Sequence, residues 1–487
     1  MEEAVEDNIL IYEKSMAGRT GYSLPATRQS EAEILKSIPE RFRRRQEAAL
    51  PEVAEPEVVR HFVRLSTKNH HIDKGFYPLG SCTMKYNPKL NDVAASMPGF
   101  QTHHPLAPCS RSTGCLQLMW ELTGFLKEVS GFPSISLQPV AGAHGEFCGL
   151  LIIRAYHLDK GRKRHKIIIP DSAHGTNPAS VSSIGFTTVE IKSNERGIIS
   201  PEAVAAALDD DVAGMMMTNP NTLGLFESNV EEIARLVHKA GALLYMDGAN
   251  LNANMGIFRP GDVGFDIMHF NLHKTFSTPH GGGGPGAGAV GVTWELDKFL
   301  PLPVLDKADD GKLFFNYNRP KSIGRLTTFY GNFANMVRAY AYIRTLGGKG
   351  LREASEIAVL NANYLKELLK RDYDLPYDRH CMHEFVLSGS RQKKLGVKTS
   401  DISKRLLDFG VHAPTNYFPL IVPEALMIEP TETETVETLE EFARIMIQIA
   451  REAETNPEIV TSAPHNTPVR RLDETLAARS LDVNFLG

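Results

Sequence analysis

The sequence predicts an α/β fold with a mostly parallel sheet. Between residues 112 and 295, amphipathic stretches such as 201–208 and 229–240 alternate with short apolar or β-branched runs. Continuous apolar runs separated by helical patterns are typical of parallel strands buried on both faces. The six predicted strands are 166–170, 187–191, 213–218, 242–247, 266–270 and 287–293.

Outside this region the pattern changes, and it predicts four segments. Charge and proline are frequent at the beginning of the chain, whereas the end is polar and irregular, as is typical of a segment lying on a surface. We expect an N-terminal arm, a large α/β domain, a smaller α+β C-terminal domain and a tail, at 1–90, 91–345, 346–456 and 457–487.

Local patterns predict elements within the arm and the smaller domain. A helical stretch is expected near 30–50, and amphipathic helices are expected at 350–371 and 433–454. Two shorter strand-like pieces lie between these last helices, at 384–387 and 411–413. Together they indicate an α+β arrangement.

Composition excludes several classes of protein. The chain has 487 residues and a formal net charge of −5, so it lacks the basic excess of a nucleic-acid-binding protein. It has no apolar run near the ~18 residues of a membrane span, and its acidic start does not resemble a secretory or transit peptide. The five cysteines form no C-x-x-C pair, which favours reduced thiols and a cytoplasmic location.

Lys274 carries the strongest chemical signal. It follows the predicted strand 266–270 within Asn-Leu-His-Lys-Thr, and a glycine-rich run follows at 281–286. A lysine held at a strand end beside backbone without side chains suits a Schiff base with a flat cofactor. Taken alone, a surface lysine beside a flexible loop explains the pattern equally well.

Asp247 favours the Schiff-base interpretation. It ends the predicted strand 242–247, one strand–helix–strand step before Lys274, and Ala249 follows closely. Pyridoxal phosphate (PLP) accepts electrons when a carboxylate keeps its ring nitrogen protonated. Asp247 fits that role, and Ala249 is small enough to pack under the ring. We therefore predict PLP as the cofactor.

Polar residues at other strand ends complete the predicted site. The segment 138–146 precedes a helical pattern, and free N–H groups at a helix amino terminus bind phosphate. His174 would stack on the ring, and the loop after 213–218 would bond its phenolic oxygen. The predicted catalytic residues are Lys274, His174 and Asp247, and the predicted cofactor-binding residues are Gly142, Ala143, His144, His174, Asn219, Thr222, Asp247, Ala249, His273 and Lys274.

These motifs in combination resemble fold-type I (aspartate aminotransferase-like) PLP enzymes. In detail they resemble the glycine dehydrogenase (decarboxylating) family, the P-protein of the glycine cleavage system. The segments that carry the resemblance are 77–88, 138–146, 171–178, 247–250, 271–286, 427–432 and 467–474. Family members are often twice as long, and this chain resembles the carboxyl-terminal half that holds the PLP lysine.

The resemblance implies an activity and partners. PLP-dependent decarboxylation of glycine would release CO2 and transfer the aminomethyl group to the lipoyl arm of the H-protein. A related subunit 1 would complete a heterotetramer. Decarboxylation is slowed by tight binding of the glycine carboxylate in the ground state, so we consider neutral polar side chains for that contact, namely Ser81, Thr83 and Thr327.

Alternatives remain open at this point. An aminotransferase or a cysteine desulfurase would share the fold, and a desulfurase would need a mobile late cysteine, for which Cys381 is the one candidate. A non-catalytic scaffold subunit is a different class, but it would be free to lose Lys274 and Asp247. No metal site is expected, because His380, His383 and Glu384 lack zinc-type spacing.

Overall fold

The computed structural model describes residues 9–23, 25–46, 48–104, 107–280 and 286–482. The glycine-rich run at 281–285, which contributes to the Schiff-base prediction, lies outside the described residues, as does the acidic start. The chain divides into two compact units, Met1–Lys74 and Gly75–Gly487. The predicted boundaries at 90, 345 and 456 stay predictions.

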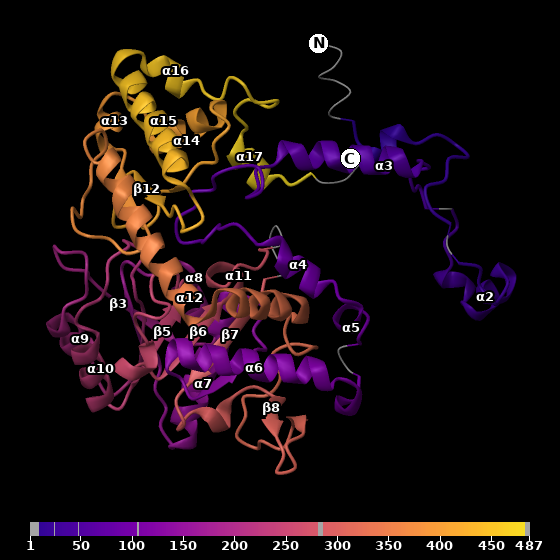
Figure 1. Cartoon of the computed structure of the whole chain (residues 1–487), viewed down its shortest axis with the longest axis horizontal. Coiled ribbons are helices and arrows are strands. Elements are labelled where there is room, and N and C mark those ends of the chain that lie inside the picture. Colours follow the sequence, from indigo (N-terminus) through magenta and orange to yellow (C-terminus); the bar gives the residue numbers. More distant parts are fainter. Residues whose placement is uncertain (1–8, 24, 47, 105–106, 281–285, 483–487) are drawn as a thin grey trace. The chain divides into compact units, whose positions relative to one another are not determined.

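The first unit consists of short helices and irregular segments (Figure 1). Its elements are η1 (Ile11–Lys14), α2 (Glu31–Ser37), η2 (Glu40–Phe42) and α3 (Glu55–Lys68). The helix expected near 30–50 begins at the predicted place. Ser30 caps the start of α2 by accepting a hydrogen bond from the N–H of Glu33. Its predicted length is wrong, since α2 ends at Ser37, just before Pro39, which favours an extended residue ahead of it.

The second unit is built on a seven-stranded sheet with the order β1-β7-β6-β5-β4-β2-β3. Strands β2 to β6 are parallel to one another, whereas β7 runs antiparallel to β6 and β1. All six predicted strands are present, each within one residue at either end. The strands are β1 (Ser134–Ser136), β2 (Lys166–Pro170), β3 (Thr187–Ile191), β4 (Val212–Thr218), β5 (Leu243–Gly248), β6 (Ile267–Asn271) and β7 (Gly288–Val292).

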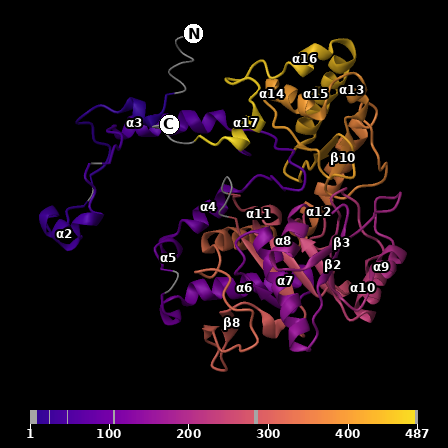
Figure 2. The ribbon, with the colours of Figure 1, turned by 180° about the vertical axis from the view of Figure 1, so that it is seen from behind.

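Helices cover both faces of this sheet (Figures 1 and 2). Alternate residues of β4 point to opposite faces: Met215 and Met217 join one apolar core, and Met216 joins the other. The first core is completed by α6 (Thr113–Ser130), α9 (Pro201–Ala207), α10 (Val230–Lys239) and the first part of α12 (Phe333–Leu369). The second core is completed by α7 (Gly142–Asp159) and α8 (Thr176–Ser183). This double covering explains why the strands read as continuous apolar runs.

The carboxyl-terminal part has its own core and a three-stranded antiparallel sheet. Helix α12 (Phe333–Leu369) leads into it and is interrupted at Gly347, which has φ +62°. The sheet has the order β10 (Phe385–Ser388), β12 (Ala425–Ile428) and β11 (Thr415–Asn416). The strand predicted at 384–387 is confirmed to within one residue. The one predicted at 411–413 is wrong, because pairing with β12 occurs at Thr415 and Asn416.

The remaining elements are short, apart from α14 and α15. They are α4 (Lys89–Ala95), α5 (Pro98–Gln101), η3 (Cys109–Arg111), η4 (Pro260–Val263), α11 (Leu272–Thr275), η5 (Asp297–Phe299), β8 (Val304–Lys307), β9 (Leu313–Asn316), α13 (Ser390–Lys394), α14 (Thr399–Asp408), α15 (Val436–Thr455), α16 (Pro457–Thr461) and α17 (Glu474–Arg479). Within the described part of the chain, no helix has both the length and the apolar character to cross a membrane.

Candidate active site

A cavity lies at the carboxyl ends of the parallel strands, where ligands of such sheets bind. Lys274 enters it from α11, directly after β6, and Asp247 enters it from the neighbouring strand β5. The chain between these strands contains only the short η4 in place of the expected helix. The Nζ of Lys274 donates a hydrogen bond of 2.6 Å to the carbonyl oxygen of Ser81.

Eight of the predicted site residues line this cavity. They come from the 77–88 loop, the start of α7, the segments after β2 and β4, the end of β5 and α11. These residues are Ser81, Gly142, Ala143, His174, Thr222, Asp247, Ala249 and Lys274. Segments far apart in the sequence thus meet at one place, as the strand-end argument predicted.

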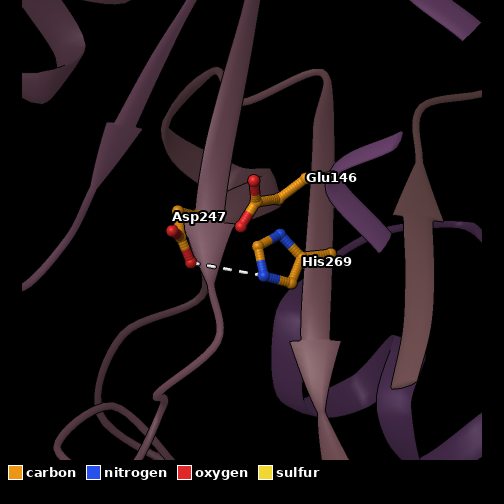
Figure 3. Close-up of side chains that lie close together, drawn as sticks. All are labelled: Glu146, Asp247 and His269. Atoms are coloured by element: carbon orange, nitrogen blue, oxygen red, sulfur yellow. Dashed lines mark ion pairs between the residues drawn. The ribbon is translucent and has the colours of Figure 1, made fainter. Parts of the chain in front are cut away.

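Asp247 is held by groups that favour its ionised form. Its carboxylate accepts from the backbone N–H of Ala249 and from Asn177 Nδ2, both at 3.0 Å, and lies 3.3 Å from His269 Nε2 (Figure 3). Burial is the largest single influence and raises the pKa of Asp247. His269, these hydrogen bonds and Lys274 together outweigh it and bring that pKa below the usual value.

Two further residues extend this buried network. The hydroxyl of Tyr245 lies 2.7 Å from His269 Nδ1, and Glu146 points toward the same place from α7 (Figure 3). Glu146 accepts from Thr176 and Ser180, each at 2.7 Å. Glu146, Asp247 and His269 have the composition of a metal site. However, both oxygens of each carboxylate already accept hydrogen bonds, so the arrangement fits a network that orients Asp247.

The start of α7 suits an anionic group. Helix α7 is 18 residues long, and Gly142 and Ala143, at its amino terminus, line the cavity. A Cβ added to Gly142 would lie 2.8 Å from the amide group of Asn271, so glycine is required for this close approach. Thr218 Oγ1 and Asn271 Oδ1 belong to lining residues and have no hydrogen-bond partner in the described part of the chain. Free N–H groups at a helix start bind phosphate, and unpartnered polar atoms can bond a further polar group. Both features fit the phosphate and phenolic groups of PLP.

Two predicted cofactor contacts lie elsewhere. The ring of His273 hydrogen-bonds with Ala287 and makes an edge contact with His280, 5.0 Å between centroids, so it does not line the cavity. Asn219 is fully buried, and its side-chain oxygen accepts from the N–H of Glu227 at 3.0 Å. Their roles in cofactor binding stay predictions without a contact to support them.

Three other predicted residues also lie outside the cavity lining. Thr83 is buried and donates to Glu429 Oε1 at 2.6 Å. His144 Nδ1 accepts from the N–H of Val140, and Thr327 bonds to the carbonyl of Phe329. The geometry therefore gives Ser81 the strongest support among the three suggested substrate contacts.

The cavity has further lining residues beyond the predicted set, and two of them come from a segment that the sequence did not place at the site. His383 and Glu384, which precede β10, line it together with Glu146, Thr176, Thr218, Pro220, Asn250 and Asn271. In the sequence, His383 and Glu384 suggest only metal ligation, which their spacing does not support. Their distance from Lys274 in the sequence gave no sign of this contact, whereas Glu146 belongs to the 138–146 motif and could have been included.

Cavity size alone would select a different place. A cavity of about 510 Å³ lies between α5, α6 and α12, whereas the one around Lys274 has about 140 Å³. The larger cavity is lined mainly by apolar and aromatic side chains, including Phe100, Phe315 and Phe333. It lacks the lysine and carboxylate combination, so the smaller cavity is the candidate active site.

Solved structures with the same fold identify the structural class. A glycine decarboxylase (P-protein) of the glycine cleavage system in inhibitor-bound form has a TM-score of 0.72 at 21% identity and covers 87% of this chain and 100% of that chain. A Lactobacillus brevis glutamate decarboxylase has a TM-score of 0.67 at 13% identity, covering 88% and 97%. The chain has the α/β fold of fold-type I PLP enzymes.

Sequence comparison narrows this class to one family. The model of the glycine cleavage system P-protein matches residues 27–315, and that of the glycine dehydrogenase C-terminal domain matches 354–470. Proteins called probable glycine dehydrogenase (decarboxylating) subunit 2 are 58% identical in Chloroherpeton thalassium and 60% identical in Caldanaerobacter subterraneus subsp. tengcongensis, over 98% of this chain and 97% and 98% of theirs. The chain belongs to the glycine cleavage system P-protein family.

Proposed function

We propose that this chain is the PLP-bearing subunit of a glycine decarboxylase, which releases CO2 and passes an aminomethyl group to the lipoyl arm of the H-protein. One observation carries the proposal: Lys274 and Asp247 reach the same cavity from the ends of neighbouring strands. The relatives' name, glycine dehydrogenase (decarboxylating) subunit 2, supports the choice of substrate.

Each part of the cofactor would have a group to hold it. The amine of Lys274 would hold the aldehyde carbon, the ionised Asp247 would keep the ring nitrogen protonated, and the amino terminus of α7 would bind the phosphate. His174 lines the cavity beside them, and burial lowers the pKa of His174, which favours the neutral ring. When bound, PLP supplies an electron sink for the bond that breaks at the substrate's α carbon.

Contacts within the protein orient the two principal groups of the site, Lys274 and Asp247. Lys274 is held by its hydrogen bond to Ser81, so its amine has a fixed direction before the cofactor binds. Tyr245 and His269 fix the Asp247 carboxylate from behind. Such preorganised groups stabilise developing charge without moving during the reaction.

Partners follow from the relatives' name, which implies a subunit 1. Within the first unit, α3 leaves Val59, Phe62 and Val63 each more than half exposed. This apolar face supports association with another surface, which we propose is subunit 1 in a heterotetramer. The five cysteines are all free thiols, in keeping with the proposed cytoplasmic location.

The cysteine desulfurase alternative receives less support. A desulfurase needs a reactive, mobile cysteine, and reactive thiols are accessible with a lowered pKa. Cys381 is only 3% exposed, and burial raises its pKa to about 12. Its position between α12 and β10 fits a structural role.

Exchange of labelled CO2 into the carboxyl group of glycine tests the proposal. The chain is loaded with PLP, combined with subunit 1 and lipoylated H-protein, and compared with an aminotransferase assay using glycine and a 2-oxo acid. We expect exchange without transamination. Transamination without exchange would assign the chain to another activity within the same fold.

A further inference from the structure

Two buried glutamates lie beside Lys274 because of the register of the small sheet. Strand β10 begins at Phe385, β12 ends at Ile428, and these two residues are antiparallel partners. Glu384 and Glu429 extend that register by one position, so their side chains emerge opposite each other. They are 3% and 0% exposed, and their oxygens lie within 4.8 Å of each other and of a His383 nitrogen.

The hydrogen bonds of the two carboxyl groups differ. Both oxygens of Glu429 accept, from Thr83 Oγ1 at 2.6 Å and from Asn250 Nδ2 at 2.9 Å, as an ionised carboxylate prefers. Among the described residues, Glu384 accepts one bond, from the N–H of Ser81 to Oε2 at 2.7 Å. Its Oε1 is 3.7 Å from His383 Nε2, beyond hydrogen-bond range. Oε1 is therefore the oxygen of the pair that is free to carry a proton.

His383 is a second group beside the cavity whose hydrogen-bonding capacity is unused among the described residues. It is 1% exposed and lines the cavity, yet neither ring nitrogen has a hydrogen-bond partner within the described part of the chain. Buried polar groups normally have partners, because an unpaired one costs free energy. A neutral imidazole offers one N–H donor, and a protonated Glu384 offers one O–H donor. Two donors side by side match the two oxygens of a carboxylate.

Resting on the proposed function, we propose that Glu384, protonated beside an ionised Glu429, and the neutral ring of His383 bind the carboxylate of the amino-acid substrate. The described lining residues of the cavity include no arginine. Binding by neutral donors orients the carboxylate but stabilises its charge less than a guanidinium would. The contact therefore holds the substrate without strongly opposing the loss of its carboxylate as CO2.

The burial of Glu384 and Glu429 and their closeness to each other favour a protonated carboxyl group. Burial and then the neighbouring Glu429 raise the pKa of Glu384 well above its usual value, and burial raises the pKa of Glu429 to about 7. Burial lowers the pKa of His383 to about 3, which keeps its ring neutral. The other titratable groups that interact with these three residues are Cys82, Cys381, Lys85 and Lys274.

The sign of the pH dependence follows. Below the raised pKa of Glu384, its proton is present and the carboxylate of the substrate is bound. As pH rises through that pKa, the proton is lost and a second negative charge repels the substrate carboxylate. The affinity for amino acids then falls by up to about tenfold per pH unit, whereas an amine without a carboxylate is unaffected.

Equilibrium binding to the PLP-loaded full chain tests this. The change in cofactor absorbance is titrated with glycine and with methylamine between about pH 6 and 9, and the ratio of the two affinities cancels the ionisation that amines share. We expect the ratio to fall with pH in the wild type. In Glu384→Gln it should fall less steeply, because the amide donates at every pH and Glu429 is then the one member of the pair that titrates. Glu227→Gln is the matched control: Glu227 is 1% exposed, with a pKa raised to about 7 by burial, and lies outside the cavity lining.

A second measurement needs no cofactor. The raised pKa of Glu384 stabilises the folded chain at low pH, and this contribution is lost as pH rises through that pKa. The melting temperature of the cofactor-free wild type should fall over that range more steeply than that of Glu384→Gln. A flat wild-type affinity ratio, or the same slope in Glu384→Gln, would overturn this inference alone. Failure of the wild type to bind PLP and methylamine would overturn the proposed function as well.

Discussion

The amine of Lys274 and the backbone of Ser81 are joined directly: Nζ donates to the carbonyl oxygen of Ser81 at 2.6 Å. The N–H of the same serine donates to Glu384 at 2.7 Å. Ser81 thus lies between the proposed Schiff-base lysine and the proposed carboxylate-binding acid. Both contacts use its backbone, so the conformation of the 77–88 loop matters more for them than the serine hydroxyl.

Changing Lys274 should abolish cofactor attachment while preserving the fold. Lys274→Ala loses both the amine and its bond to Ser81, whereas Lys274→Arg keeps a donor but forms no stable Schiff base. In the wild type we expect borohydride to fix the cofactor on the peptide containing Lys274, as seen by mass spectrometry. Neither variant should show this or exchange glycine with CO2. Lys239→Ala, which changes an exposed lysine at the end of α10, should behave as the wild type. A cofactor fixed in Lys274→Ala would contradict the assignment.

Asp247→Asn should retain PLP but lose most turnover. The amide preserves the volume and one acceptor, yet it has no charge to hold the ring nitrogen protonated. Removal of one such electrostatic group reduces rate by roughly 10²–10³-fold. Cofactor absorbance measures binding, and glycine–CO2 exchange measures rate. Exchange within about twofold of wild type would contradict the role of Asp247, since that is far less than the loss of such a group causes.

The conformation of Ser81 makes a separate prediction. Its φ is +63°, in the left-handed region that glycine adopts readily and β-branched residues avoid. Ser81→Gly should keep the backbone contacts to Lys274 and Glu384, whereas Ser81→Val should destabilise the fold by about 1–3 kcal/mol. Urea unfolding measures the difference. If Ser81→Gly folds normally but loses glycine affinity, the hydroxyl itself contacts the substrate.

The sequence predicted the central sheet and much of the site, because both depend on local patterns. Strands buried on both faces are continuous apolar runs, and parallel strands bring their polar ends together, which placed Lys274, Asp247 and His174 around one cavity. The contact of Glu384 with Glu429 depends on the register of β10 against β12. That register is a tertiary feature, so no local pattern indicated that the two side chains face each other. The position of His273 has a related cause, since the path of the chain turns its ring toward Ala287, and its predicted role stays a prediction.

A buried ion pair should fix the loop that carries Ser81. Lys85 Nζ lies 2.7 Å from Glu432 Oε1 and from Asn252 Oδ1, and the lysine and glutamate side chains are 1% and 8% exposed. Lys85→Met would leave Glu432 buried without its cation, which should cost about 3–5 kcal/mol. Lys85→Met combined with Glu432→Gln should recover part of that loss. Urea unfolding measures the free energy of unfolding of the single and the double variant. Equal values for these two variants would show that the two side chains do not act as a pair.

Association with subunit 1 should depend on the apolar face of α3. Phe62 is 56% exposed there, beside Val59 and Val63 at 53% and 54%. Exposed apolar residues on one helix face usually pack against a partner. Phe62→Glu should therefore weaken association with subunit 1, whereas Arg64→Gln, which makes the same change in net charge at an exposed position on the opposite side of α3, is the matched control. Analytical ultracentrifugation of each variant with subunit 1 measures association, and glycine–CO2 exchange of the mixture measures its consequence. If the wild type alone is fully active and does not change mass on mixing, the chain works without this partner. If both variants associate as the wild type does, the α3 face is not the contact.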